Sequence, residues 1–172
     1  MIKISLLLIF TQMWWLPVPC AAQEKPVTLK IWNLHPKPIV RGTLNGKSAY
    51  FLLDTGSDIN VLHSGGQKRY NFRTQKNNYE WARNYRLSTV NGLQRDLFKV
   101  HGIRMELEGT NISCDFHALD IHGIVNAVRK RTGIHIAGII GSETMKDYFF
   151  VIDYEMEQVM LKFPKYSKSW FR

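Results

Sequence analysis

The stretch that decides the fold reads Phe51-Leu52-Leu53-Asp54-Thr55-Gly56-Ser57. Three apolar residues, typical of a buried strand, lead to one carboxylate and then to a turn. Hydrophobic surroundings disfavour ionisation of a carboxyl group, so such a junction suits acid–base chemistry. Gly56 lets the backbone approach the carboxylate closely, and the two flanking hydroxyls can orient it. An ordinary acid at a strand-to-turn junction is the alternative, because the Asp-Thr-Gly triplet alone is a weak signal.

A second stretch reads Ala137-Gly138-Ile139-Ile140-Gly141 and continues into Ser142-Glu143-Thr144-Met145-Lys146. The apolar run predicts a buried strand that ends at glycine. Ser142 is a residue type that can cap the short helix expected to follow. Taken alone, this pattern indicates only a strand-to-helix junction.

The rest of the chain predicts short strands joined by turns. Asn45-Gly46 and Asn91-Gly92 are dipeptides typical of tight hairpins, and each has β-rich runs on both sides. Residues 64–84 are polar and poorly periodic, which indicates a surface excursion with at most one helical turn. A short basic helix is expected over 122–131, ended by Gly133. Further strands are expected over 27–32, 39–44, 48–53, 59–62, 85–90, 93–100, 103–107, 112–119, 136–140, 149–153 and 158–163.

Together, the two stretches resemble the retropepsin-like family of aspartic proteases over residues 38–163. The C-terminal part of this range is similar to that of exported bacterial members of the family. The resemblance implies a mostly β fold, a small closed acid-protease barrel with one or two short helices. It implies a catalytic Asp54 and the site residues that follow. These are Thr55, Gly56 and Ser57 in the catalytic loop, Ile139, Ile140 and Gly141 behind it, and Thr89, Val90, Asn91 and Gly92 in a flap over the substrate.

The resemblance also implies a mechanism. The chain contains one Asp-Thr-Gly triplet, whereas the chemistry needs two carboxylates that share a proton and activate a water. A homodimer with one Asp54 from each chain would supply them, acting on an extended peptide or protein without cofactor or metal. In this family Thr55 is expected to bridge the two chains, and Ser57 to donate to the outer carboxylate oxygen.

The N-terminal residues of the chain predict export. Residues 1–22 read as a signal peptide, with Lys3 before an apolar run and small residues before Gln23. The mature chain is then expected in the periplasm or outside the cell, with an uncleaved leader that anchors it to the membrane as the alternative. Residues 23–37 form an N-terminal extension and strand, and 164–172 a basic tail. Cleavage would leave Cys114 as the sole cysteine, which excludes a disulfide framework and suits a small buried hydrophobe in a strand.

The charge is strongly positive, at +9 with a pI near 9.7. Cations gather over residues 67–86, over 129–131 and in the tail. Solvated surface is the favoured interpretation. Weak attraction to an anionic membrane surface or to acidic substrates stays open. Nucleic-acid binding is disfavoured, because no known nucleic-acid-binding motif accompanies the charge.

Two other hypotheses come from the remaining residues. Asp115, His117, Asp120 and His122 resemble a metal cluster, but strand alternation separates them, and solvated polar side chains explain them better. The second hypothesis is a domain of the same fold without catalytic activity. Such a domain would bind an extended peptide or a partner protein, or act as a basic envelope or nucleic-acid binding module. The intact catalytic loop favours the protease.

Overall fold

The computed structural model describes residues 26–35, 37–76, 87–89, 92–94 and 97–163. The strands are β1 (Val27–Asn33), β2 (Ile39–Leu44), β3 (Lys47–Asp54), β4 (Asn60–His63), β5 (Arg73–Lys76), β6 (Leu87–Thr89), β7 (Gly92–Gln94), β8 (Phe98–His101), β9 (Met105–Leu107), β10 (Thr110–Ile112), β11 (Phe116–Leu119), β12 (Gly138–Gly141), β13 (Val151–Asp153) and β14 (Gln158–Leu161). The helices are η1 (Ser64–Gly66), α1 (Gln67–Tyr70), α3 (His122–Thr132) and α4 (Ser142–Asp147). The predicted mostly β class is confirmed.

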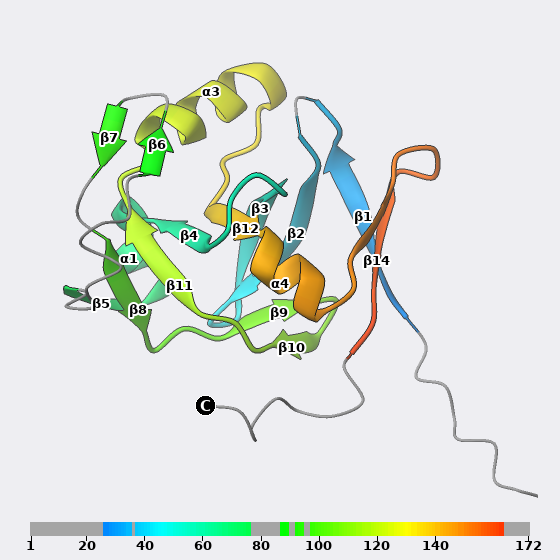
Figure 1. The fold of residues 1–172 in the computed structure, drawn as a ribbon, viewed down its shortest axis with the longest axis horizontal. Helices are drawn as coiled ribbons and strands as arrows, with labels where there is room; N and C mark the ends of the chain where they lie inside the picture. Colours follow the sequence, from blue (N-terminus) through cyan, green and yellow to red (C-terminus); the bar gives the residue numbers. More distant parts are fainter. Residues whose placement is uncertain (1–25, 36, 77–86, 90–91, 95–96, 164–172) are drawn as a thin grey trace, which may run out of the picture.

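One strongly curved sheet carries most of these strands (Figure 1). Its order is β13-β14-β1-β2-β3-β12-β4-β11-β8-β5, and the β9–β10 hairpin joins through β2. Hydrogen bonds do not link β13 to β5, so the sheet is not closed as the predicted barrel would be. Most neighbours are antiparallel, but β12 runs parallel to β3, and β11 parallel to β4. The two parallel pairs lie side by side at the centre, where the catalytic loop begins.

The predicted Asn45-Gly46 turn joins β2 to β3 and is confirmed. Both residues have positive φ, 48° and 75°, as a tight hairpin turn requires. The Asn45 side chain also ties this turn to two distant segments. Its amide donates to the carbonyls of Tyr70 and Gly102, both at 2.8 Å, and its oxygen accepts from the Arg104 N–H. Asn45 therefore fixes the turn end of the β2–β3 hairpin.

Two hydrophobic cores lie on the two faces of the central strands. Phe51 and Leu53 of β3 belong to the larger core, whereas Leu52 belongs to the smaller one. β12 divides in the same way, with Ile140 in the first core and Ile139 in the second. Successive strand residues point to opposite faces. Strands covered on both faces therefore need unbroken apolar runs, which explains the sequence before Asp54.

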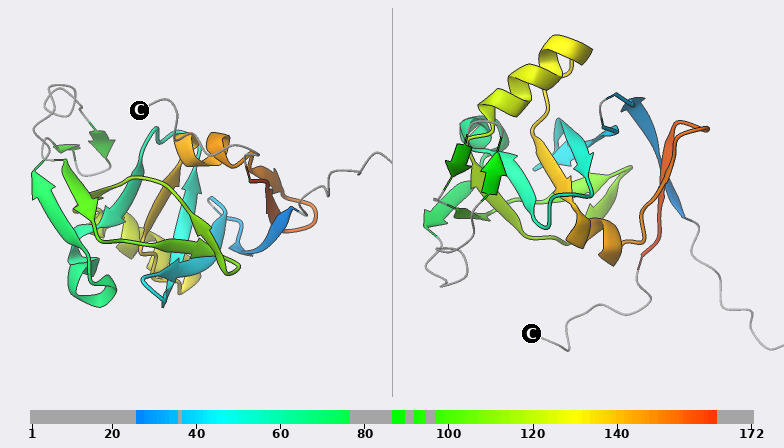
Figure 2. Two further views of the ribbon diagram at one scale, coloured as in Figure 1. Left: turned by 90° about the horizontal axis from the view of Figure 1, so that it is seen from below. Right: turned by 45° about the horizontal axis from the view of Figure 1, so that its top comes forward.

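Helix α3 covers the smaller core (Figure 2). Val125 and Val128 are its buried residues, and they pack with that core. Gly133 ends the helix with φ of 74°, and its N–H donates to the Arg129 carbonyl at 2.9 Å, as predicted. The cations of the last turn, residues 129–131, are exposed and favourably placed at the negative end of the helix dipole.

Several local predictions were wrong. Gly141, not Ser142, is the N-cap of α4, and no side chain caps that helix. The strand expected over 112–119 is broken at 113–115 into β10 and β11. Cys114 therefore lies in an irregular connection between two strands, although it still packs on the larger core. The polar excursion over 64–84 contains β5 as well as helical turns, because β5 pairs with β8.

The β13–β14 hairpin leaves apolar side chains in solvent at one end of the sheet. Phe149, Val151, Tyr154 and Met156 are each more than half exposed. β13 is also an edge strand, with β14 as its neighbour in the sheet. An exposed edge that carries large apolar residues is a surface suited to a partner. Within the described residues, no helix is both long and apolar enough to cross a membrane.

We expect folding stability to fall as the pH falls below neutral, with His117 as one cause. Burial lowers the pKa of His117 from its ordinary value of 6.5. The charge of Asp115 opposes this shift, and the charge of Lys99 adds to it. The unfolded chain therefore binds more protons than the folded chain below about pH 6.5, so acid favours unfolding. Thermal melts of wild type and His117→Gln from pH 7.5 to 5 should show a smaller loss in the variant. The exposed His122→Gln serves as the control, and equal slopes in all three proteins would contradict the assignment.

Candidate active site

Asp54 is the last residue of β3 and lies level with Gly141 of the parallel strand β12. Its Oδ1 accepts a hydrogen bond from the Gly56 N–H at 3.0 Å. The side chain is 21% exposed, and Thr55 and Gly56 are more exposed still. The fold thus holds one carboxylate at the rim of a buried strand, with its backbone donor in place and its outer side open.

The loop after Asp54 crosses the end of β12. β12 lies between β3 and β4 in the sheet, so the chain must pass over Gly141 to reach β4. A Cβ on Gly141 would lie 2.4 Å from the Ile59 oxygen and 2.7 Å from the Ser57 oxygen. The Ser142 N–H donates to the same Ser57 oxygen at 2.7 Å. The predicted backing stretch therefore does lie behind the catalytic loop, and glycine is required at its end.

Asn60 is a buried polar residue beside the candidate site that the sequence analysis did not single out. It is 3% exposed, and its side chain binds three partners. The amide donates to the Asp115 carbonyl at 2.8 Å and to the Thr144 hydroxyl at 2.7 Å, and the oxygen accepts from the Gly141 N–H at 2.9 Å. Asn60 thus joins the catalytic loop, β12, α4 and the turn before β11. In the sequence, only its closeness to Asp54, six residues earlier, could have pointed to Asn60.

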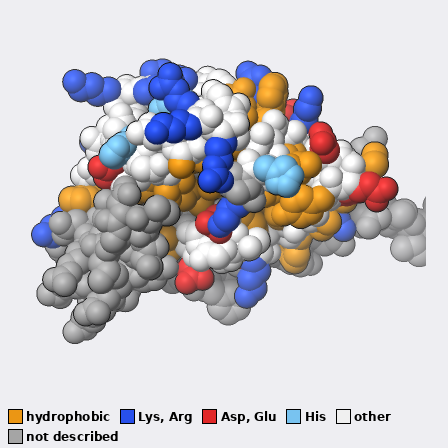
Figure 3. Space-filling view, turned by 90° about the horizontal axis from the view of Figure 1, so that it is seen from above, with side chains coloured by type: hydrophobic (Ala, Val, Ile, Leu, Met, Phe, Trp, Pro, Cys, Tyr) orange, Lys and Arg blue, Asp and Glu red, His pale blue; other side chains and the backbone are white. Residues whose placement is uncertain are grey.

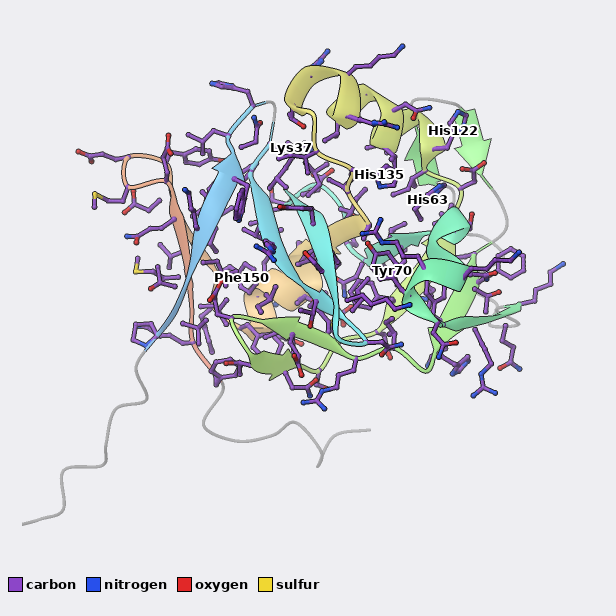
Figure 4. The ribbon with its side chains drawn as sticks, turned by 180° about the vertical axis from the view of Figure 1, so that it is seen from behind. Lys37, His63, Tyr70, His122, His135 and Phe150 are labelled. Atoms are coloured by element: carbon purple, nitrogen blue, oxygen red, sulfur yellow. The ribbon has the colours of Figure 1, made fainter. Side chains whose placement is uncertain are left out.

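Lys37 was also missed, and it is the one cation described at the carboxylate. Its ammonium forms an ion pair with Asp54 Oδ1, the oxygen that also binds Gly56. Lys37 lies in the loop between β1 and β2, below α3 (Figure 4). The Leu53 N–H donates to the Pro38 carbonyl at 2.9 Å. This bond holds the backbone next to Lys37 against the residue that precedes Asp54.

The catalytic-loop hydroxyls differ from the expectation in one respect. Ser57 Oγ donates to the Ile59 carbonyl at 2.8 Å, so its proton is not directed at the carboxylate as the resemblance implied. This bond stabilises the turn, because it closes the loop just before β4. Thr55 is exposed, as a residue that contacts a second chain would be. Its predicted bridging role stays a prediction.

The two strands of the predicted flap hairpin are β6 and β7. β6 and β7 pair antiparallel, with Thr89 opposite Gly92. Val90 and Asn91, at the predicted tip, lie outside the described residues. β6 and β7 form a separate two-stranded sheet. The role of this hairpin as a flap stays a prediction.

The metal-like cluster is not brought together. No group of three or more His, Cys, Asp or Glu side chains is arranged to hold a metal ion in the part of the chain described here. Asp120 accepts from the His122 N–H at 3.0 Å and lies 3.8 Å from His63 Nδ1. His117 is buried on β11, so its interpretation as a solvated side chain was wrong.

Three histidines lie near one another at α3, which begins at His122. His63 lies with His122 and His135 around it (Figure 4). Burial lowers the pKa of His63, Asp120 opposes that shift, and the two histidines add to it. Near neutral pH the His63 ring therefore favours its neutral form. Lys and Arg side chains spread across the same face of the molecule, around patches of apolar surface (Figure 3).

Replacing Asn60 should loosen the whole site. Asn60→Ala removes three hydrogen bonds and leaves the Gly141 N–H without its partner, so we expect a loss of about 3 kcal/mol in unfolding free energy. Urea denaturation measures this loss. Asn111→Ala, at an exposed position on β10, is the matched control and should change stability by less than about 0.5 kcal/mol. Equal effects of the two substitutions would show that Asn60 does not join these segments.

Gly141→Ala tests the loop crossing. The added methyl group meets backbone oxygens, which cannot rotate away, so we expect a loss of about 2 kcal/mol or more. Gly102→Ala is the comparison, because its methyl group meets open space and costs about 1 kcal/mol through positive φ alone. Thermal melts of both variants measure the difference. A Gly141→Ala protein as stable as wild type would exclude the close approach of the loop.

Comparison with known proteins agrees with this geometry. No protein-family model matches the sequence, and no curated protein matches it significantly. Among solved structures, a retropepsin-like aspartic protease from Rickettsia conorii is similar, with a TM-score of 0.52 and 14% identity over 81% of this chain and 91% of that one.

Two further structures are also similar. One is EIAV protease in complex with the inhibitor HBY-793, with a TM-score of 0.46 and 22% identity over 67% of this chain and 90% of that one. The other is the retroviral protease-like domain of Ddi1 from Leishmania major, with a TM-score of 0.45 and 15% identity over 81% and 96%. On the agreement with the Rickettsia structure and the strand order around Asp54, the chain has the fold of the retropepsin-like aspartic proteases.

Proposed function

We propose that this chain is an aspartic endopeptidase, active as a homodimer in which each chain supplies one Asp54. The observation that carries the proposal is the position of this carboxylate. It ends a buried strand of a retropepsin-like fold, accepts a hydrogen bond from Gly56, and is followed by the exposed residues Thr55 and Gly56. A single carboxylate cannot act as both base and acid, so a second chain must complete the site.

The reaction uses both carboxylates in turn. Like charges placed close together cannot both stay ionised, so the pair holds one proton. The ionised carboxylate takes a proton from a bound water, and the water oxygen attacks the peptide carbonyl carbon. The protonated carboxyl gives its proton to the carbonyl oxygen. Collapse of the resulting diol breaks the C–N bond, and a proton passes to the leaving amine.

The flap supplies a means of holding the peptide. β6 and β7 form a hairpin outside the main sheet, so the hairpin can lie against an extended substrate without disturbing the core. Extended peptides are held by backbone hydrogen bonds to such strands. Thr89, Val90, Asn91 and Gly92 are therefore proposed as substrate-binding residues, and closure over the peptide would exclude bulk water.

The exposed hairpin β13–β14 supports the dimer. Val151 on the edge strand, together with Phe149, Tyr154 and Met156 beside it, forms an apolar surface that a second chain would bury. Each buried apolar side chain contributes roughly 1.5–3 kcal/mol, which several such contacts turn into stable association. Isologous pairing of two copies is the simplest way to complete a site that holds one carboxylate per chain.

The leader and the charge extend the proposal to location. We place the mature chain in the periplasm or outside the cell, with residues 1–22 as its signal. The exposed cations Arg129, Lys130 and Arg131 suit weak attraction to an anionic membrane surface. Sedimentation with anionic vesicles at low salt tests this attraction, and binding that does not weaken in high salt would argue against it.

Asp54→Asn is the decisive variant. The amide keeps the size of the side chain but neither ionises nor shares a proton, so we expect cleavage of a mixed peptide library to fall by at least about a thousandfold. Wild type and variant should be compared from acid to neutral pH, with equal circular dichroism spectra as evidence of folding. Asp58→Asn, at an exposed acid in the same loop, is the matched control for loss of charge.

The outcome separates the two readings of the fold. Cleavage by wild type and Asp58→Asn, but not by Asp54→Asn, would support the protease. If folded wild type cleaves nothing at any pH, a non-catalytic domain that binds an extended peptide becomes the better explanation.

A further inference from the structure

We infer that Lys37 is an autoinhibitory latch, which occupies the Asp54 carboxylate in the single chain and must leave it when two chains assemble. The inference rests on the proposed function, because a latch matters only where the carboxylate joins a dyad. Its basis is the ion pair between Lys37 Nζ and Asp54 Oδ1. This is the same oxygen that accepts from Gly56.

The position of Lys37 follows from the backbone. Pro38 restricts the residue before it to extended conformations, and the Pro38 carbonyl accepts from the Leu53 N–H. Within the one chain, Lys37 precedes Pro38 and Asp54 follows Leu53, so each lies next to one of two residues joined by a hydrogen bond. The contact is therefore set by a backbone hydrogen bond beside it and not by a chance meeting of two surface side chains.

The chemistry of the contact opposes catalysis. The dyad needs one proton shared between two carboxylates, because their like charges repel. An ammonium on each carboxylate would supply the charge balance that this proton supplies. The shared proton, which must pass to the substrate carbonyl oxygen, would then have no reason to bind. A lysine that stays on Asp54 therefore removes the general acid of the proposed reaction.

The latch is weak enough to open. The Lys37 side chain is 44% exposed, and that of Asp54 is 21% exposed. Ion pairs this close to solvent contribute little to stability, so association of two chains can displace them. The ion pair can open by rotation about side-chain bonds alone, because the hydrogen bond between the Leu53 N–H and the Pro38 carbonyl stays in place. The single chain thus keeps its carboxylate neutralised, and assembly exposes it.

The test measures assembly and activity separately, on the full chain. The dimer dissociation constant should be determined by sedimentation equilibrium for wild type, Lys37→Met, Asp54→Asn and the double variant. Lys37→Met removes a contact that only the single chain makes, once per subunit, so the constant should fall by about fivefold. In the Asp54→Asn background the same substitution should have no effect. Lys76→Met, on the exposed edge strand β5, is the charge-matched control and should leave the constant unchanged.

Activity provides the second readout. Lys37→Met should reach its half-maximal specific activity at a lower protein concentration than wild type, with the same kcat at saturating concentration. A lower kcat would place Lys37 in the reaction itself and overturn the latch. So would an unchanged dissociation constant, an effect that persists with Asp54→Asn, or a chain that stays monomeric at every concentration. If the coupling appears but no variant cleaves any peptide, the ion pair opposes assembly as inferred, but the protease assignment fails and the autoinhibitory role fails with it.

Discussion

The passage of the catalytic loop over the end of β12 is the constraint on which the rest of this structure depends. β12 lies between the two strands that the loop connects, so the chain has one route, directly across Gly141. Glycine makes the close approach possible, and Asn60 and Ser142 hold it by hydrogen bonds. Asp54 is presented at the rim because β3 ends where this crossing begins.

The two hydrophobic cores make that crossing rigid. β3 and β12 are covered on both faces, by α3 on one side and by the larger core on the other. A strand packed on both faces cannot shift along its neighbour without moving two sets of buried side chains at once. The position of the carboxylate is therefore tied to the packing of the whole domain. Under the proposed function, a second chain supplies the partner carboxylate.

Charge and assembly are linked at this point. The single chain pairs its carboxylate with Lys37. Lys and Arg side chains are also spread over the face of the molecule shown in Figure 3. Apolar side chains of the β13–β14 hairpin remain in solvent at one end of the sheet. Both features fit the proposal that a second chain completes the site. Under the proposed function, association would bury the apolar surface and replace the lysine with a second aspartate.

The sequence by itself determined the elements that depend on neighbouring residues. The Asn45-Gly46 hairpin, the helix ended by Gly133 and the apolar run before Asp54 were all predicted, because turn chemistry and periodicity act over a few residues. The resemblance then linked Asp54 with Gly141, and the structure pairs them on adjacent parallel strands.

Tertiary structure alone decided how that loop is held and what touches the carboxylate. Asn60 and Thr144 are 84 residues apart in sequence but hydrogen-bonded in the fold. Lys37 reaches Asp54 because the backbone hydrogen bond between Leu53 and Pro38 holds the neighbouring residues together. The break at 113–115 and the strand β5 likewise depend on partners elsewhere in the sheet. Local pattern carries no information about such pairs, since their energy exists only once the chain has folded.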